Sequence, residues 1–347
     1  MIKVYKDSKI YVYCLAGHAS GGAELLHQLV SFLRDNGKDA YIILTGTREH
    51  KLHPEYAKYN VVLADGIEDN EHNIEVLYEP EFYRAALDTR TQKILWWLSV
   101  DNFYRCCNGF LALKDIAKWS RKQAFRTMLS RMYHKMLKHD GTYSKTLSLE
   151  DVARLGAVSA YQSEYAQNFL QNHGFKEMFA LKDYINTDHC KDFPTDGRED
   201  IVLYNPQKGM DYTSKLISLA PDIKWVPIIN MTRAQVIETM RKAKIYIDFG
   251  FHPGKDRLPR ECAMNGLCII TGRRGSANFF EDISIDDRYK FDEKKCRKTD
   301  VISVIRDTLA HYSERIDDFS FYRYRISLEK AEFEQQIRDC FINNTIG

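Results

Sequence analysis

Basic side chains and glycines gather after two apolar segments in the second half of the chain, residues 245–249 and 267–270. The residues that follow are Gly254, Lys255, Asp256 and Arg257 after the first segment, and Arg273, Arg274, Gly275, Ser276 and Ala277 after the second. Guanidinium and ammonium groups bind phosphate oxygens, and glycines let backbone N–H groups approach them closely. Both segments therefore predict a site for a phosphate-bearing ligand.

The elements expected to position these residues are two strands and a helix. Each apolar run has the length and composition of a buried strand of a parallel sheet. A short helix is expected between them, ended by Gly266. Because the carboxyl ends of neighbouring parallel strands meet at one edge, where open α/β sheets bind ligands, both basic segments should face the same site.

Composition limits what the chain can be. Its 347 residues exceed one ordinary core and predict two domains. A formal net charge of +2 predicts no nucleic-acid partner, so any basic function is local. The eight cysteines show no CxxC pair or metal-ligand spacing, and no secretory leader or membrane-length apolar run is visible. A cytoplasmic protein is expected.

Apolar and helical segments alternate in two series, which predicts an α/β fold with two doubly wound parallel sheets. A polar, turn-rich linker at residues 186–200 separates the series. In the first series we expect strands at 9–15, 40–44, 60–63, 74–77, 93–98, 157–162 and 179–183, and a helix at 23–35. In the second we expect strands at 201–204, 224–229, 245–249 and 267–270, helices at 212–219 and 233–242, and a last helix from about 323 to 341.

Two such halves predict a ligand in a cleft between them. A glycine loop, residues 17–22, follows the first expected strand. It is neither a GxGxxG fingerprint nor a Walker A loop, so the main evidence for a dinucleotide enzyme or an NTPase is missing. Taken alone, Gly21 and Gly22 fit a tight strand-to-helix turn equally well.

Three motifs resemble those of GT-B glycosyltransferases, above all the large retaining family that includes sucrose synthases and bacterial mannosyltransferases. They are Gly21-Gly22-Ala23-Glu24, Tyr204-Asn205-Pro206-Gln207-Lys208-Gly209, and Arg260-Glu261-Cys262-Ala263-Met264-Asn265-Gly266. The resemblance implies two Rossmann-like domains, at residues 1–190 and 198–318, with a helix at 319–347 that packs back on the first domain. It also implies that Lys208 meets the donor diphosphate and that Glu261 holds the nucleotide ribose.

One position departs from the family pattern. Relatives carry a second acid eight residues before the one matched by Glu261, and here that position is Pro253. Asp256 or the backbone around Gly254 is then the candidate for holding the donor sugar. No DxD motif is present, so a metal-independent, retaining transfer is expected, without a cofactor.

The expected site follows from the charge that grows on a departing diphosphate, which positioned cations and N–H donors stabilise. The expected catalytic residues are Lys208, Glu261 and Asp256, and the expected donor-binding residues are Gly21, Gly22, Asn205, Gly254, Arg257, Arg260, Arg273, Arg274, Gly275, Ser276 and Ala277. Interpretations without a ligand also remain open. Arg273 and Arg274 could lie in a solvated loop, Glu261 could interact with the dipole of its helix, and Asp256 could pair with Arg260. A solvated side chain is the preferred interpretation of Lys255.

The acceptor side is expected in the first domain. Trp97 ends a strand and could stack on a sugar while Asp101 accepts a hydroxyl hydrogen bond. His18 lies in the glycine loop and could reach a donor across the cleft. Core tryptophans, a helix cap and an incidental loop histidine are the alternatives.

Residues 111–138 carry eight basic side chains and one acidic side chain, within a helical insertion near 110–140. Apolar residues recur there at helical spacing, from Phe125 to Met136. Such a helix could lie on an anionic membrane, which would place the protein peripherally on an inner membrane face. The alternative is a helix packed on the first domain with a solvated basic face.

The leading hypothesis is a glycosyltransferase that moves a sugar from a nucleoside-diphosphate sugar to a glycan or a lipid-linked acceptor. A nucleotide-sugar epimerase of similar architecture is the second candidate enzyme. The third hypothesis is a catalytically silent relative that serves as a binding or assembly subunit. It remains possible because Pro253 stands where the family has an acid.

Overall fold

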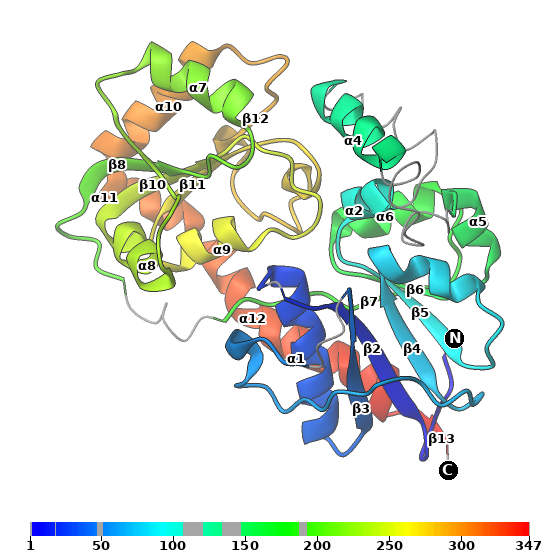
Figure 1. Ribbon diagram of the computed structural model, residues 1–347. Helices are drawn as coiled ribbons and strands as arrows, with labels where there is room; N and C mark the ends of the chain where they lie inside the picture. Colours follow the sequence, from blue (N-terminus) through cyan, green and yellow to red (C-terminus); the bar gives the residue numbers. More distant parts are fainter. Residues whose placement is uncertain are drawn as a thin grey trace. The chain divides into compact units, whose positions relative to one another are not determined.

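The computed structural model describes residues 2–17, 19–46, 51–106, 121–133, 147–186 and 193–346 (Figure 1). The chain divides into two compact units. Unit 1 comprises Met1–Asp183 and Glu332–Gly347, and unit 2 comprises Tyr184–Ala331. Each unit is built around its own parallel sheet.

Unit 1 holds a six-stranded parallel sheet in the order β3-β2-β4-β5-β6-β7. The strands are β2 (Lys9–Leu15), β3 (Asp39–Thr45), β4 (Ile74–Tyr78), β5 (Gln92–Trp97), β6 (Val158–Tyr161) and β7 (Met178–Ala180). Their apolar runs are buried on both faces, as parallel sheets require. A further short parallel pair joins β1 (Val4–Tyr5) to β13 (Thr345–Ile346).

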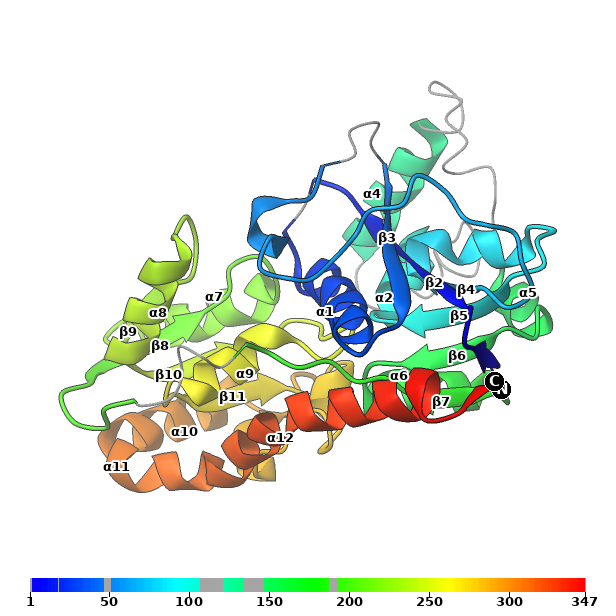
Figure 2. The same ribbon diagram turned by 90° about the horizontal axis from the view of Figure 1, so that it is seen from below.

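Helix α1 (Gly21–Asp35) follows β2 and buries its leucine face against β2 and β3 (Figure 2). Ser20 caps it, because its hydroxyl accepts a hydrogen bond from the Ala23 amide. The other helical segments of unit 1 are η1 (Pro54–Tyr56), η2 (Glu79–Ala86), α2 (Val100–Cys106), α4 (Arg121–Tyr133), α5 (Leu149–Arg154) and α6 (Glu164–Asn172).

Unit 2 holds a five-stranded parallel sheet in the order β12-β11-β10-β8-β9. The strands are β8 (Glu199–Tyr204), β9 (Lys224–Pro227), β10 (Ala243–Asp248), β11 (Cys268–Gly272) and β12 (Lys290–Phe291). The helical segments are α7 (Met210–Leu219), α8 (Arg233–Lys242), α9 (Arg257–Met264), η5 (Ser276–Asn278), η6 (Asp287–Tyr289), α10 (Lys298–Ala310), α11 (Tyr312–Arg315) and η7 (Ile316–Phe319).

Helix α12 (Ser320–Ile337) continues without a break from unit 2 into unit 1, where the π-helical turn η8 (Arg338–Ile342) extends it (Figure 2). In unit 2 its Tyr322 and Ile326 join the core beneath β10 and β11. In unit 1 the amide of Gln336 accepts a hydrogen bond from the Lys182 backbone N–H, and Arg338 donates to Asn36. The last helix thus supplies side chains to both cores.

In each sheet the strand order reverses once, which creates a topological switch point. It lies between β2 and β4 in unit 1 and between β8 and β10 in unit 2. The predicted doubly wound α/β architecture is confirmed, and with it the expected strands 9–15, 74–77, 201–204 and 245–249 to within a few residues.

Two strand predictions need correction. Residues 60–63 make only a single bridge, Ile42 to Leu63, because Val62 is exposed and the segment turns away at Asp65 and Gly66. The strand expected at 179–183 is shorter and earlier, Met178–Ala180.

Of the segment 111–138, only α4 lies within the described residues. Among those residues, no helix combines the length and the apolar character needed to cross a membrane.

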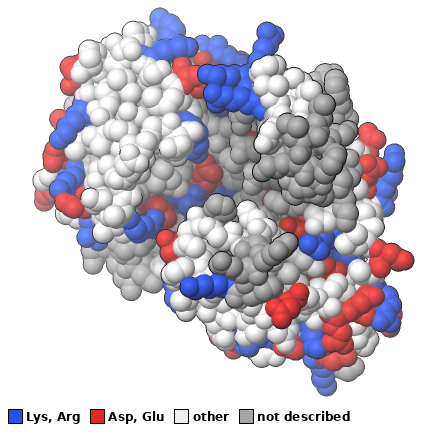
Figure 3. Space-filling view, viewed as in Figure 1, with Lys and Arg blue, Asp and Glu red and all other residues white. Residues whose placement is uncertain are grey.

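Acidic and basic side chains are interspersed on the face of the molecule that Figure 3 shows. This matches the small formal net charge of the sequence. A charge-based function must therefore come from a local arrangement of residues.

Candidate functional site

The switch point of unit 2 brings together the loops that follow β8 and β10. Gly209 makes this possible: its φ is +69°, and a Cβ there would come within 2.5 Å of the Gly250 nitrogen and of the Phe249 carbonyl carbon. A Cβ on Gly250 would in turn meet the Lys208 side chain at 2.5 Å. Both glycines are required by the close approach of the two loops, which places Lys208 over the end of β10.

Lys208 lies between two carboxylates. Its ammonium is 3.0 Å from Asp248 Oδ2 and also contacts Asp256 Oδ2. Asp248 is fixed by hydrogen bonds from the Tyr246 hydroxyl and from the Gly250 amide, both at 2.9 Å. Burial lowers the pKa of Lys208, but the charges of Asp248 and Asp256 outweigh it and raise the pKa above its usual value. The lysine is therefore a fixed cation.

His252 completes this group of charges. The ring is fully buried, with Nδ1 3.0 Å from Asp256 Oδ2 and Nε2 3.5 Å from Asp248 Oδ1, although neither nitrogen has hydrogen-bond geometry. Burial disfavours the charge of Asp256, yet His252 and Lys208 together hold its pKa well below the ordinary range. Ligand atoms of Asp248, His252 and Asp256 lie within 4.8 Å of one another, which is the chemistry of a metal-binding set.

Arg260 and Lys255 lie at the start of α9 and are buried rather than facing a ligand. Arg260 is 0 % exposed; its Nη1 is 2.8 Å from Glu329 Oε2, and its Nη2 donates to the Lys255 carbonyl. The Lys255 ammonium is 2.7 Å from Glu329 Oε1. Two predictions are therefore corrected: Lys255 is 8 % exposed instead of solvated, and the Arg260 guanidinium serves the packing of α12 against α9.

Glu261, the expected ribose ligand, is held by a residue from α8. Arg233 donates from Nη1 and Nη2 to the two carboxylate oxygens, at 2.8 and 3.0 Å. This fork fixes the orientation of the carboxylate. Each oxygen keeps a further lone pair, so a diol can still be accepted.

The loop after β11 carries the two expected diphosphate ligands. Arg274 forms an ion pair with Glu293, and Arg273 Nη2 is 2.7 Å from the exposed Asp287 carboxylate. Gly275 has φ +59°, and a Cβ there would lie 2.0 Å from the His252 carbonyl oxygen. This close approach explains why glycine stands at this position.

One of the backbone N–H groups that were expected to bind the donor at this loop, that of Ser276, already has a partner in the protein. The Ser276 amide donates to the His252 carbonyl at 2.9 Å and its hydroxyl to the Gly254 carbonyl at 2.7 Å, so Ser276 ties two loops together. Ser276 does begin a helical turn, the three-residue η5, in which Ala277 is buried. Arg257 begins α9, and Asn205 Oδ1 accepts from the Gln207 amide in the loop after β8.

Glu293 gives this loop a predicted pH dependence. Burial raises its pKa to about 7, although Arg274 opposes the shift. If Arg274 binds the donor, affinity for an intact nucleoside-diphosphate sugar should rise as the pH falls from 8 to 6, because a protonated Glu293 no longer neutralises Arg274. Glu293→Gln should flatten this dependence. Titration calorimetry at the two pH values measures it, and an equally steep dependence in Glu293→Gln would refute it.

In unit 1, Gly21 and Gly22 form the first turn of α1. Neither has a left-handed φ, and a Cβ on Gly22 would make only an ordinary 3.6 Å contact with Leu98, so the fold does not require a glycine at position 22. His18 lies outside the described residues.

The predicted stacking of Trp97 on a sugar is wrong: the indole is 0 % exposed, packs on Phe82, Phe103 and Phe175, and donates to Ser159. Asp101 lies in the first turn of α2.

Several residues of the site were missed from the sequence. Asp248, His252 and Asp256 recur every four residues, a spacing that could have been noticed. The partners Arg233, Glu293 and Glu329 come from elements far along the chain, and no local pattern indicates them.

No protein-family model matches the sequence, and no curated protein matches it. Solved structures match over nearly the whole chain. Sucrose-phosphate synthase from Thermosynechococcus elongatus has a TM-score of 0.59 at 9 % identity, covering 96 % of this chain and 98 % of that one. A glycosyltransferase from Rickettsia africae has a TM-score of 0.55 at 12 % identity, with coverage of 96 % and 99 %. The catalytic domain of Arabidopsis thaliana starch synthase IV, bound to ADP and acarbose, has a TM-score of 0.56 at 10 % identity, with coverage of 99 % for both chains.

This chain has the GT-B fold. The expectation drawn from the three motifs is thereby confirmed for the architecture. At these identities the likeness concerns the fold alone, and the residues that would bind a donor have to be argued from the chain itself.

Proposed function

We propose that this protein is a glycosyltransferase that uses a nucleoside-diphosphate sugar as donor. The observation that carries the proposal is the arrangement at the switch point of unit 2, where a fixed lysine and an oriented carboxylate stand in a GT-B fold. The starch synthase IV domain was solved with ADP and acarbose, and a similar Anabaena protein, HepE, with UDP and glucose. A nucleotide-linked sugar is the corresponding ligand class here.

In this proposal the residues of unit 2 divide into two groups. Lys208 and Arg274, with the Gly275 and Ala277 amides, stabilise the negative charge that develops on the departing diphosphate. Glu261 accepts hydroxyl groups of the ribose, and Arg233 holds it in position. Asp256 acts on Lys208 by fixing the place of the ammonium. Retention of anomeric configuration follows from the resemblance to the retaining family.

Metal independence is part of the proposal. A divalent cation at Asp248, His252 and Asp256 would need the carboxylates that the Lys208 ammonium already contacts. Displacing this partly buried ammonium would leave it without either carboxylate partner, which costs free energy. The lysine therefore supplies the positive charge that a metal ion supplies in other transferases.

For the acceptor we propose a glycan or a lipid-linked glycan, presented at an anionic membrane surface. The support is α4, which carries exposed apolar side chains at helical spacing, Phe125, Leu129, Met132 and Tyr133, each 48 to 57 % exposed. Arg121, Lys122 and Arg126 are exposed on the same helix, which has no acidic residue. Apolar insertion flanked by cations is the property of helices that lie in a membrane interface.

The test is a panel of nucleoside-diphosphate sugars, with binding, released nucleoside diphosphate and product measured for each. Stabilisation by at least one nucleotide and its turnover with an acceptor are expected. No binding by any nucleotide would refute the transferase. Recovery of an altered nucleotide sugar would indicate an epimerase, and binding without turnover on any acceptor would indicate a silent relative.

Glu261→Ala sharpens this test. Losing hydroxyl hydrogen bonds to a charged group should weaken nucleotide binding about ten- to hundredfold, while thermal stability changes little. Glu238→Ala on α8 is the matched control, because it removes an exposed carboxylate that is paired with Lys242 on the same helix. Equal affinities in the two variants would contradict the ribose assignment.

A further inference from the structure

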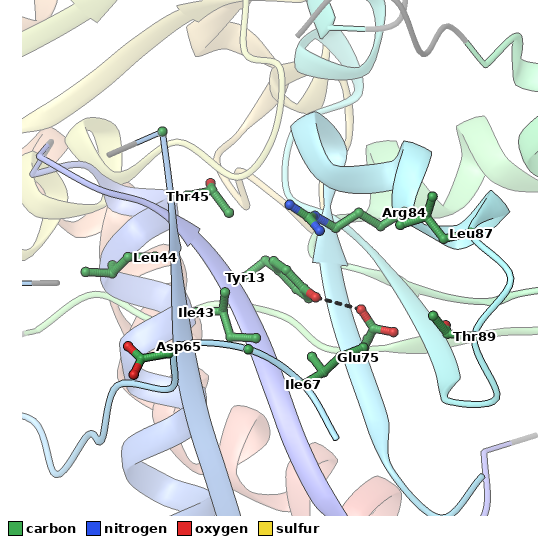
Figure 4. Close-up of a pocket in the computed structure, with 12 residues that line it drawn as sticks. Tyr13, Ile43, Leu44, Thr45, Asp65, Ile67, Glu75, Arg84, Leu87 and Thr89 are labelled. Carbon is green, nitrogen blue, oxygen red and sulfur yellow. Dashed lines mark hydrogen bonds between the residues drawn. The ribbon is translucent and has the colours of Figure 1, made fainter. Parts of the chain in front are cut away.

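A cavity lies in unit 1 on the face of the sheet opposite α1. The connection between β4 and β5 is a single short 3₁₀ segment, η2, which is too small to cover β3, β2 and β4. The uncovered region forms a pocket of about 410 Å³ beneath η2 and the loop at Asp65–Ile67 (Figure 4). A volume of this size accommodates one or two sugar rings and falls within the range of small-ligand sites.

The floor of the pocket is a closed polar network around Glu75. Its carboxylate accepts hydrogen bonds from the Tyr13 hydroxyl at 2.8 Å and from the Thr91 hydroxyl, and it lies 3.4 Å from the Lys93 ammonium. Burial and the charge of Glu75 both raise the pKa of Tyr13, so the phenol keeps its proton and donates it to Glu75. The Tyr13 oxygen retains acceptor capacity toward the pocket (Figure 4).

Arg84 enters the pocket from η2. Its Nε donates to Glu81 at 2.5 Å, and the guanidinium carbon lies 4.6 Å from the centre of the Tyr13 ring. The pair with Glu81 and the stacking on Tyr13 fix the plane of the guanidinium. Its two Nη groups carry no hydrogen bond to any described residue, and Figure 4 shows this end of the side chain reaching over Tyr13. They are preorganised donors for a ligand.

The charges of the pocket decide between ligand classes. Arg84 is paired with Glu81, and Glu75 with Lys93. Among the lining residues that the structure describes, the charged ones are Asp65, Glu75 and Arg84, so this lining carries no excess of positive charge, which an anionic ligand would need. The apolar side chains of Ile43, Ile67 and Leu87 also line the pocket, together with Thr45 and Thr89. Hydrogen-bond donors and acceptors beside an apolar wall suit a neutral ring that bears hydroxyl groups.

We propose that this pocket binds a neutral sugar residue. Arg84 donates to hydroxyl or ring oxygens, the Tyr13 oxygen accepts a hydroxyl hydrogen, and the apolar wall meets the C–H face of the ring. The site requires no donor nucleotide and no turnover. It would serve a transferase as a holding site for a sugar of its acceptor, and it would equally serve a catalytically silent binding subunit.

A substitution at Gly66 should fill part of the pocket without changing its polar network. Gly66 lines the cavity, has no left-handed φ, and a Cβ there would meet no atom within 4 Å. Gly66→Leu should therefore fill the rim without strain, and Gly66→Ala is the matched control. Arg84→Lys keeps a cation beside Glu81 and removes the planar pair of donors.

The experiment is saturation-transfer NMR and titration calorimetry of the full chain. The probes are neutral mono- and disaccharides (glucose, galactose, mannose, N-acetylglucosamine, maltose and cellobiose), with glucuronate and inorganic phosphate as anions. We expect saturable binding of at least one neutral sugar with a Kd on the order of millimolar. Gly66→Leu should weaken it at least about tenfold and Arg84→Lys several-fold, whereas Gly66→Ala and Glu238→Ala should leave it unchanged.

Three results would overturn the proposal: no saturable binding of any neutral sugar, binding of the anions only, or unchanged binding in Gly66→Leu. Melting temperatures of the variants separate loss of the pocket from loss of the fold. Nucleotide binding, measured on the same samples, reports unit 2 independently. A failed sugar site with intact nucleotide binding contradicts only this inference, and the reverse pattern contradicts only the proposed function.

Discussion

Lys208→Met is expected to abolish donor turnover and to destabilise unit 2 by about 3–5 kcal/mol at neutral pH, the typical cost of removing one partner from a buried ion pair. Methionine nearly preserves the volume of the side chain but removes the ammonium that contacts both Asp248 and Asp256. Of these, Asp248 is almost completely buried. The uncompensated negative charge would also repel a diphosphate from the switch point.

The destabilisation should depend on pH. In the native protein the pKa of Asp256 is depressed, so its pairing stabilises the fold above the carboxyl's unfolded pKa and is lost as the pH falls through the folded one. The difference between the two proteins should therefore shrink as the pH falls below about 4. Urea unfolding at pH 7 and at pH 3, with nucleotide titration at pH 7, measures both effects.

Lys224→Met is the control, since this lysine forms an exposed pair with Glu199 at 2.6 Å. Exposed pairs contribute about 0–1 kcal/mol, so this variant should unfold like the native protein. Adding Asp256→Asn to Lys208→Met should restore part of the stability without restoring turnover. A Lys208→Met protein that unfolds like the Lys224→Met control would contradict the buried ion-pair cluster.

Glu329→Gln is expected to cost a similar amount, about 3–5 kcal/mol, by removing a buried carboxylate charge that two buried cations share. The carboxylate on α12 is the shared partner of Arg260 at 2.8 Å and of Lys255 at 2.7 Å, and all three side chains are nearly inaccessible. The amide keeps the shape and one acceptor oxygen, so the loss reports charge rather than packing. Differential scanning calorimetry and urea unfolding measure it.

Glu314→Gln is the matched control, because Glu314 is exposed on α11 in the same unit. It should change the unfolding free energy by less than about 0.5 kcal/mol. The comparison also tests the corrected role of Arg260. If Arg260 bound the donor instead, Glu329→Gln would free its guanidinium and tighten nucleotide binding while leaving stability unchanged.

The fold was largely readable from the sequence because hydrophobic periodicity and glycine positions are local signals. The run at 245–249 and the helix stop at Gly266 are both present, and Gly266 takes the expected left-handed conformation. Residues 60–63 were misread because an apolar composition does not reveal whether a segment has a neighbour to pair with along its whole length.

The site was predicted less well, since an isolated charged residue has the same appearance whether it is solvated or paired in the core. Lys255 and Arg260 are buried because Glu329 approaches from α12, some seventy positions later in the chain. Trp97 was assigned to an acceptor because it ends a strand, but four aromatic residues from outside β5 cover it. Partner identity is tertiary information, and a single sequence carries little of it.

The division of the chain has a consequence for the order in which the protein is made. Unit 2 is one uninterrupted run, Tyr184–Ala331, placed inside unit 1, whose last part is Glu332–Gly347. Strand β1 is synthesised before the whole of unit 2, yet its partner β13 is synthesised after it, as is Thr345, which accepts a hydrogen bond from Lys38. On the ribosome, the unit that begins first is thus completed last. A nascent chain stopped after Ala331 would carry every residue of unit 2 beside a unit 1 that still lacks its closing segment.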